Sequence, residues 1–481
     1  MTVGLIIAII SSYFLLLILV SYLTGKKDDN ASFFLGNKQS PWYVVAFGMI
    51  GASLSGVTFV SVPGYVEANS FSYMQVVLGY VFGYAVIIKV LLPLYYRLNL
   101  TSIYTYLSQR FGNSSYKTGS VFFILSRVIG ASFRLYLVAD ILQYAVFDQL
   151  EVPFWFTVLI TILLIWVYTF RSGIKTIVWT DTLQTTFMLA AVGISIWMIK
   201  DSLIPDGSLV EYIADSSKSK IFFFDDWKSA DFFIKQFLSG MFITIVMTGL
   251  DQDMMQKNLS CRNLKDAQKN MFWLAIILVF VNLIFMSLGV VLYDFAAVNG
   301  IEESGDRLFS AVALHGGLGI TLGVFFLIGL VAAAYSSADS ALTALTTSFC
   351  VDILEVDKMK ERSAISTRKW VHIGFSICLL FTILIFKQLD QGSIIKEIFV
   401  AAGYTYGPLL GLFAFGLFTK WKIEDRWVPI IAIASPLLCY FLKQNSMDWL
   451  GYQFGFELLI LNGLLTFLGL CLLIRKEESK I

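Results

Sequence analysis

Oxygen-bearing side chains inside long apolar stretches are the residues of this sequence most able to do chemistry. Asp181 stands in one such stretch, and Ser336, Ser337, Asp339 and Ser340 stand in another. Residues 336, 339 and 340 are spaced i, i+3 and i+4, so they share one face of a helix. A charge inside hydrocarbon is costly, and such residues usually mark an ion or substrate pathway. Because carboxylates and hydroxyls are hard oxygen ligands, the cluster predicts a site for a small hard cation. A serine-rich face by itself is more typical of hydrogen bonding between helices.

A second unusual stretch, residues 47–64, is rich in Gly, Ser and Thr at mid-membrane depth and ends in Pro63-Gly64. Small residues of this kind can pack two helices closely. They are also typical of an interrupted helix, whose freed carbonyl oxygens bind a cation. Such irregular backbone persists at that depth only where it is buried or lines a cavity. Beside the carboxylate–serine cluster, the stretch predicts an interrupted helix that binds a small cation together with a hydroxyl-lined partner.

The elements that must position these residues are membrane-spanning helices. Of the 481 residues, 57% are hydrophobic and 14% are charged, with a mean hydropathy of +0.74. An ordinary soluble domain is about a quarter charged, so a soluble class is excluded. A spanning helix needs roughly 20 apolar residues, and the apolar runs predict about thirteen spans. They lie near 3–23, 43–65, 72–96, 119–146, 153–170, 178–199, 232–256, 270–293, 318–349, 367–387, 394–419, 427–442 and 453–474.

The basic residues predict the orientation of these spans. Lys and Arg gather in the gaps that follow the odd-numbered spans, and such gaps stay cytoplasmic. The gap after span seven, with Lys257, Arg262, Lys265 and Lys269, is one of them. We therefore expect the N-terminus outside and the C-terminus in the cytoplasm. The short tail and the lack of outward-facing glycosylation triplets favour a bacterial inner membrane.

Several other kinds of chemistry are excluded. A net charge of +1 gives no bulk electrostatic reason to bind nucleic acid. Five single cysteines and two distant histidines lack the spacing of a disulfide framework or a zinc site. No metal motif or nucleophile–base pair indicates an enzyme. Within the spans, Arg127 and Asp140 are candidates for a structural ion pair.

The sequence resembles the sodium:solute symporter family in motifs distributed along nearly the whole chain. They are residues 54–64, 93–97, 106–112, 134–139, 172–184, 251–256 and 333–340. The resemblance implies an all-α polytopic membrane protein with a LeuT-like fold, in which two five-helix repeats have inverted topology. The first helix of each repeat, spans two and seven here, would be broken at mid-membrane. The implied division is a leading helix and loop (1–42), repeat one (43–200), an extracellular loop (201–231), repeat two (232–422), and two last helices with a tail (423–481).

The resemblance also implies ion sites. The common sodium site would use the carbonyls of Gly51, Leu54 and Ala333 and the hydroxyls of Ser336 and Ser337. A one-residue slip in span two would move its ligands to Ala52 and Ser55. A second sodium site, found in some members, would use Asp181, Ser336, Asp339 and Ser340. Where some members have a serine at the position of Asp339, this chain has a carboxylate that could hold a proton instead, so the stoichiometry stays open.

The implied substrate pocket contains Ser53, Ser55, Thr58, Gln75, Arg134, Thr244, Thr248, Tyr404 and Thr405. Arg134 narrows the substrate most, since a buried guanidinium forms a bidentate pair with a carboxylate. The prediction is a monomeric Na⁺-coupled symporter that imports a small polar solute, foremost a carboxylated sugar such as sialic acid. Alternatives are a neutral sugar or polyol, a proline-like amino acid, a vitamin or an inorganic anion. A membrane sensor with a transporter-like fold is the alternative from another class.

Overall fold

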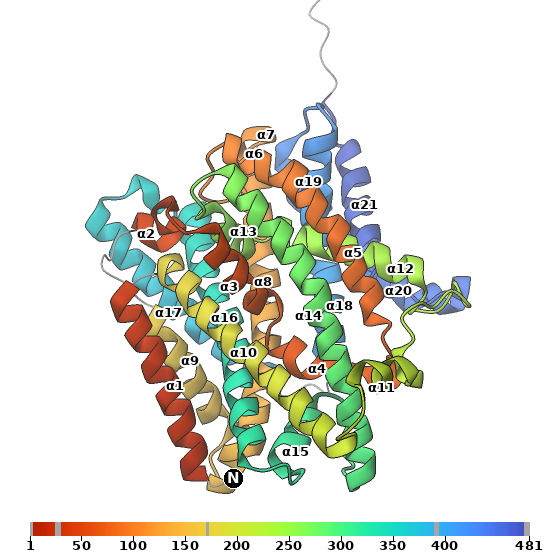
Figure 1. Cartoon of the computed structure of the whole chain (residues 1–481). Coiled ribbons are helices and arrows are strands. Elements are labelled where there is room, and N and C mark those ends of the chain that lie inside the picture. The colour runs from red at the N-terminus through yellow and green to blue at the C-terminus, as the bar shows by residue number, and fades with distance from the viewer. Residues whose placement is uncertain (1–2, 25–29, 170–172, 389–393, 476–481) are drawn as a thin grey trace, which may run out of the picture.

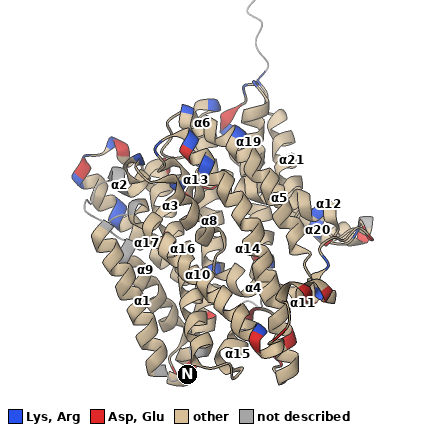
Figure 2. Ribbon diagram, viewed as in Figure 1, with Lys and Arg blue, Asp and Glu red and all other residues tan. Residues whose placement is uncertain are grey.

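The fold comes from a computed structural model that describes residues 3–24, 30–169, 173–388 and 394–475 (Figure 1). The first residue of the 172–184 motif therefore lies outside the described residues. Long helices run between two ends of the molecule. Charged residues gather mainly at these two ends, and the band between them is mostly uncharged in this view (Figure 2). This distribution is the one expected of helices that cross hydrocarbon.

Each expected span has a helix or a bent pair of helices. The unbroken ones are α1 (Val3–Thr24), α8 (Asn113–Leu142), α9 (Phe154–Thr169), α10 (Ile174–Leu203), α14 (Leu264–Asn299), α16 (Ile320–Ser348), α17 (Glu361–Phe386), α20 (Val428–Leu450) and α21 (Leu458–Cys471). A further span joins α5 (Tyr73–Val86) to α6 (Leu92–Arg97) through a π-helical turn. Short helices α2 (Asn30–Leu35), α7 (Thr105–Arg110), α11 (Leu209–Asp215) and α15 (Leu308–His315) lie in the connections.

Three spans are bent pairs. They are α3 (Trp42–Ser53) with α4 (Gly56–Asn69), bent by 54°; Phe233–Gly249 with α13 (Gln252–Leu259), bent by 62°; and α18 (Ile394–Thr405) with α19 (Gly407–Phe418), bent by 47°. The second pair begins with α12 (Phe233–Thr244). By length and composition, eight helices can cross a membrane, or up to eleven with each bent pair as one span. The shorter apolar helices in α9 and α21 correspond to the remaining two expected spans.

Spans two and seven are both broken, as the resemblance implied, and local chemistry explains the form of the breaks. The first lies at Leu54 and Ser55, inside the glycine- and serine-rich stretch. At the second, the Asp251 carboxylate accepts hydrogen bonds from the backbone N–H groups of Asp253 and Met254, and so caps α13. The third break, at Tyr406, was not expected. It precedes Gly407-Pro408, where proline starts a new helix because it has no N–H to continue the previous one.

Two sets of packed helices surround these breaks. Helices α3, α10 and α16 pack against one another, and α5 packs closely along α12. The α5–α12 contact depends on glycine: a Cβ atom on Gly240 would lie 2.0 Å from the Val76 carbonyl oxygen, and one on Gly79 would lie 2.1 Å from the Phe237 carbonyl oxygen. The two backbones therefore touch, as is usual where small residues form a helix interface in a membrane.

This contact predicts that Gly240→Val is destabilising. Forcing a branched side chain against the α5 backbone should lower the free energy of unfolding by about 1–3 kcal/mol. Thermal unfolding of the purified protein in detergent would report this loss as a lower Tm. Gly130→Val is the matched control, because a Cβ atom at Gly130 in α8 has nothing within 4 Å. Equal Tm values for Gly240→Val and the parent would contradict the close contact.

Candidate functional site: an interrupted helix beside a central cavity

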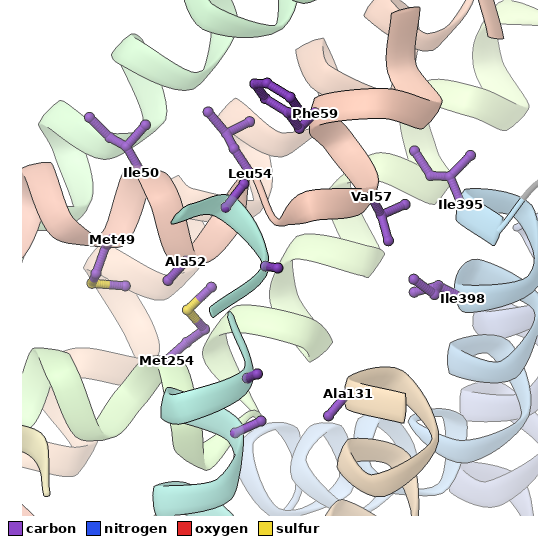
Figure 3. Packing of buried hydrophobic residues seen from close by; sticks show 14 of the residues in the cluster. Met49, Ile50, Ala52, Leu54, Val57, Phe59, Ala131, Met254, Ile395 and Ile398 are labelled. Carbon is purple, nitrogen blue, oxygen red and sulfur yellow. The ribbon is translucent and has the colours of Figure 1, made fainter. Parts of the chain in front are cut away.

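The break between α3 and α4 is held from two sides. From α10, the Thr185 hydroxyl accepts a hydrogen bond from the Gly51 N–H (3.0 Å) and lies 3.4 Å from the Gly48 carbonyl oxygen. From α16, Ala334 lies so close that a Cβ atom on Gly56 would be 3.4 Å from its Cα. Figure 3 shows the buried side chains around the bend. The irregular backbone is thus enclosed by protein, as it must be at membrane depth.

Hydroxyl groups of α16 approach the carbonyl oxygens that the break leaves without helical partners. The Ser337 hydroxyl donates a hydrogen bond to the Ala52 carbonyl (3.4 Å). The Ser55 carbonyl already accepts from the N–H of Phe59, which begins the ladder of α4. For the implied sodium site, this geometry favours the carbonyl of Ala52 as a ligand beside that of Gly51. It also favours the carbonyl of Leu54 over that of Ser55, which already has a partner. Ala333 and Ser336 are buried on the same helix as Ser337.

Asp181 is engaged by two partners in the interior. Its Oδ1 accepts a hydrogen bond from the Ser336 hydroxyl (2.7 Å), and its Oδ2 accepts from the Lys257 ammonium (2.7 Å). The side chains of Lys257 and Asp181 are each 1% exposed. The expectation that Lys257 belongs to a cytoplasmic loop is therefore wrong. The 62° bend directs α13 into the protein, where it contacts α10.

Asp339 and Ser340 form a second contact in the same region. The Asp339 Oδ1 accepts from the backbone N–H of Ser340 (2.6 Å) and from its hydroxyl (3.3 Å). The Ser340 hydroxyl also lies 3.0 Å from the carbonyl of Ser336, to which it can donate. The residues expected to form a second ion site thus lie in one buried region, with Lys257 as an additional member that sequence reasoning missed. No signal in the sequence separated Lys257 from the loop residues that follow it.

A small cavity of about 90 Å³ lies beside the break. Six of the nine residues expected to bind substrate line it: Ser53, Ser55, Thr58, Arg134, Thr244 and Thr248. Tyr73, Tyr80, Tyr84 and Asn282 line it as well and were not expected. The three tyrosines are spaced by seven and four residues along α5, so they share one helical face, which is the signal that would have found them.

The other three expected residues lie elsewhere. The Gln75 side chain donates to the carbonyl of Asp231 (3.0 Å) and accepts from the N–H of Phe223 (3.2 Å), so it secures the long loop after α10. The Tyr404 ring packs near Tyr440. The Thr405 hydroxyl donates to the carbonyl of Ala401 within α18. Their role in substrate binding stays a prediction.

Arg134 places at the cavity a guanidinium whose hydrogen-bond donors are not all satisfied. Its side chain comes from α8, and the residue is only 9% exposed. Among the described residues, its Nε and Nη1 atoms have no hydrogen-bond partner. A buried donor without a partner is destabilising, and more so when it is charged. A ligand with a carboxylate would form a charge-assisted pair with the guanidinium.

Arg127, two turns earlier on α8, joins the second and third breaks. It pairs closely with Asp253 and lies 3.7 Å from Asp251, whose Oδ2 also accepts a hydrogen bond from the Tyr406 hydroxyl. The proposed Arg127–Asp140 pair does not form. Asp140 instead pairs with Arg307 (3.1 Å) and Lys387 (2.7 Å), because it lies at the opposite end of α8 from the breaks.

A wide vestibule opens at the end of the molecule predicted to face outward. Its volume is about 940 Å³, and it is lined by charged side chains that include Glu67, Asp231, Asp306 and Arg307. Burial raises the pKa of Asp231 and of Asp306, both in loops at its rim. The rings of Tyr73 and Phe399 stack with centroids 6.4 Å apart, and both residues line the small cavity. Both residues also line a small gap, and Tyr65 lines this gap as well as the vestibule. The aromatic pair therefore separates the vestibule from the cavity.

Solved structures share this arrangement of helices. A substrate-bound, outward-open Na⁺-coupled sialic acid symporter superposes with a TM-score of 0.83 at 19% identity, over 98% of this chain and 97% of that one. The nucleobase-cation-symport-1 family transporter Mhp1, in a closed conformation, gives 0.56 at 14% identity, over 92% and 93% of the two chains. The fold is thus the LeuT-like fold of secondary transporters.

Sequence comparisons define the family. The model of the sodium:solute symporter family matches residues 33–424, and the chain belongs to this family. Sodium-coupled monocarboxylate transporter 2 of Homo sapiens is 26% identical over 82% of this chain, which spans 65% of that relative's length. The sodium/sialic acid symporter NanT of Aliivibrio fischeri is 25% identical over 83% of this chain and 80% of its own length.

The hydroxyl–carbonyl contact at the break predicts that Ser337→Ala weakens sodium binding. Losing one oxygen ligand should raise the Na⁺ concentration for half-maximal stabilisation by about tenfold, or ~1.4 kcal/mol. The measurement is the Tm of the purified protein as Na⁺ replaces K⁺ at constant ionic strength. Ser195→Ala is the control, since the Ser195 hydroxyl donates within its own helix to the carbonyl of Ala191. An unchanged midpoint in Ser337→Ala would remove this hydroxyl from the sodium site.

Proposed function

We propose that this protein is a symporter that uses the inward Na⁺ gradient to import a carboxylate-bearing solute by alternating access. Na⁺ would bind at the break between α3 and α4, to the carbonyls of Leu54, Ala333 and Gly51 or Ala52. The hydroxyls of Ser336 and Ser337 would complete the site. A small cation with oxygen ligands suits this donor set. The sodium-coupled relatives support the same assignment.

The observation that carries the substrate class is the Arg134 guanidinium at the wall of the cavity. Its unpaired donors need an acceptor, and an anion would also balance its charge. Among the described residues, no Asp or Glu lines the cavity, although Arg127 and Arg134 both do. An amino acid would bring an ammonium group with no carboxylate in the lining to pair with. A neutral sugar or polyol could accept hydrogen bonds from the guanidinium but would leave its charge without a counter-ion. The cavity therefore favours an organic anion.

Among organic anions, we favour a carboxylated sugar such as sialic acid. Its carboxylate would bind Arg134, and the hydroxyl-bearing residues Ser55, Thr58, Thr244 and Thr248 would contact its hydroxyl groups. The relatives that carry sialic acid support this choice. The cavity of about 90 Å³ is smaller than a site for a molecule of that size, so the Tyr73–Phe399 pair must move for it to bind.

The second candidate substrate is a small monocarboxylate. The present volume suits a molecule of few atoms, and relatives described as monocarboxylate transporters share similar identity with this chain. Both candidates use Arg134 in the same way. Uptake into proteoliposomes of labelled sialic acid, lactate, proline and a neutral sugar, with and without a Na⁺ gradient, would separate them. Uptake that ignores Na⁺ would refute symport.

The setting of this function follows from the expected orientation. We propose a monomer in a bacterial inner membrane, with the N-terminus outside and the C-terminus in the cytoplasm, working as a transporter rather than as an enzyme. The vestibule would then face the outside and receive the solute. A transporter-like sensor remains the alternative of another class, and net uptake of the solute into sealed vesicles would argue against it.

Arg134 provides a direct test. Arg134→Gln should reduce uptake of the carboxylate by at least about 100-fold, since a charge-assisted bidentate pair is lost. Na⁺-dependent thermal stabilisation should persist, because the sodium site is separate. Lys89→Gln, at a position in the π-helical turn that follows α5, is the control for loss of a cation within a span. Carboxylate uptake by Arg134→Gln at the parent's rate would refute the anchoring role.

A further inference from the structure

Lys257 has a buried position for which the proposed transport cycle gives no role. Its ammonium lies 2.7 Å from the Asp181 carboxylate, and both side chains are 1% exposed. The next residue back, Gln256, donates to the Phe34 carbonyl (2.6 Å) and the Thr347 hydroxyl (3.0 Å), which fixes α13 in place. The ammonium therefore lies in the interior and is attached to the chain.

Asp181 is also the principal carboxylate of the second sodium site implied by the family resemblance. That site would draw on Asp181, Ser336, Asp339 and Ser340. In this structure one Asp181 oxygen accepts from Lys257 and the other accepts from Ser336. A Na⁺ ion at the same carboxylate would meet a second cation close by in a medium of low dielectric, where like charges repel strongly.

We propose that Lys257 is a tethered cation that takes the place of the second Na⁺, so that this transporter binds a single coupling Na⁺. This inference rests on the proposed function, because it fixes the ion stoichiometry of that same symport. Asp181 is neutralised by a charge that never leaves the protein. Only the Na⁺ at the break between α3 and α4 then enters and leaves in each cycle.

The pair also positions a ligand of that Na⁺. A hydroxyl has one donor and two acceptor lone pairs. Because Ser336 donates its proton to Asp181, its lone pairs are left for the ion at the break. Lys257 and Asp181 thus orient a ligand of the first sodium site as well as occupying the second, in the way that outer partners orient metal ligands elsewhere.

If the substrate is a monoanion, the proposed stoichiometry also fixes the net charge that moves in each transport cycle. One Na⁺ and one carboxylate carry no net charge, so transport by the parent should not respond to membrane potential. Removing the ammonium leaves the Asp181 carboxylate without its counter-ion, in the buried region that also contains Ser336, Asp339 and Ser340. A second Na⁺ should then bind, and transport by that variant should drive positive charge inward.

The test counts bound ²²Na⁺ on the purified full-length protein without substrate, so it does not depend on which solute is carried. The parent should bind one Na⁺ per molecule with a Hill coefficient near one. Lys257→Met, which keeps the length and removes the charge, should bind two, with a Hill coefficient above one. Lys257→Arg, which keeps a cation, should bind one. The double variant Lys257→Met/Asp181→Asn should also bind one, because it removes both members of the pair.

Two bound Na⁺ in the parent, or one in a folded Lys257→Met, would overturn the inference. If Lys257→Met does not fold, the double variant decides. The double variant contains no unpaired charge from this pair, so it should fold. If the parent binds one Na⁺ more than the double variant, Asp181 holds Na⁺ despite Lys257. Equal binding of one Na⁺ by both supports the inference. Failure of the parent to bind any Na⁺ would instead refute the proposed sodium coupling itself.

Discussion

In a bilayer, a backbone carbonyl that leaves a helix must find another partner inside the protein, and this requirement governs the structure at each of its three bends. At the first, Thr185 binds Gly51 and Ser337 reaches Ala52. At the second, Asp251 caps the new helix. At the third, the Asn462 side chain donates to the carbonyls of Gly403 and Tyr404. The polar side chains at each bend meet the needs of an interrupted backbone, and under the proposed function the oxygen atoms at the first bend would also bind Na⁺.

The helices were predictable because hydrocarbon imposes a simple rule on composition. Each apolar run of the sequence became a helix or a bent pair, and the glycine- and serine-rich stretch at 47–64 became the first break. The third break was missed, although Gly407-Pro408 marks it, because the charges of that span, Lys396 and Glu397, lie at its start and none stands near the break. A proline near the middle of an apolar run deserves the same weight as a buried carboxylate.

The site was predictable in part. Residues next to a break, such as Ser55 and Thr58, face the cavity because the break itself forms its wall. Gln75 lies beyond the start of the next helix, where a loop from the other half of the chain competes for its side chain. Lys257 shows why a count of basic residues does not locate every cytoplasmic loop correctly. A loop and the end of a helix look alike in sequence, and only the direction of α13 shows that Lys257 is buried.

The glycine contact between α5 and α12 couples two helices that line the cavity. Their backbones touch at Gly79 and Gly240, so neither helix can turn about its own axis with a larger side chain at these positions. Tyr80 and Tyr84 of α5 and Thr244 of α12 line the cavity from this pair, whereas Arg134 belongs to α8. Under the proposed alternating access, α5 and α12 would move together. The polar groups that the pair contributes would then keep their arrangement, and a solute would be released by a change in their distance from the guanidinium.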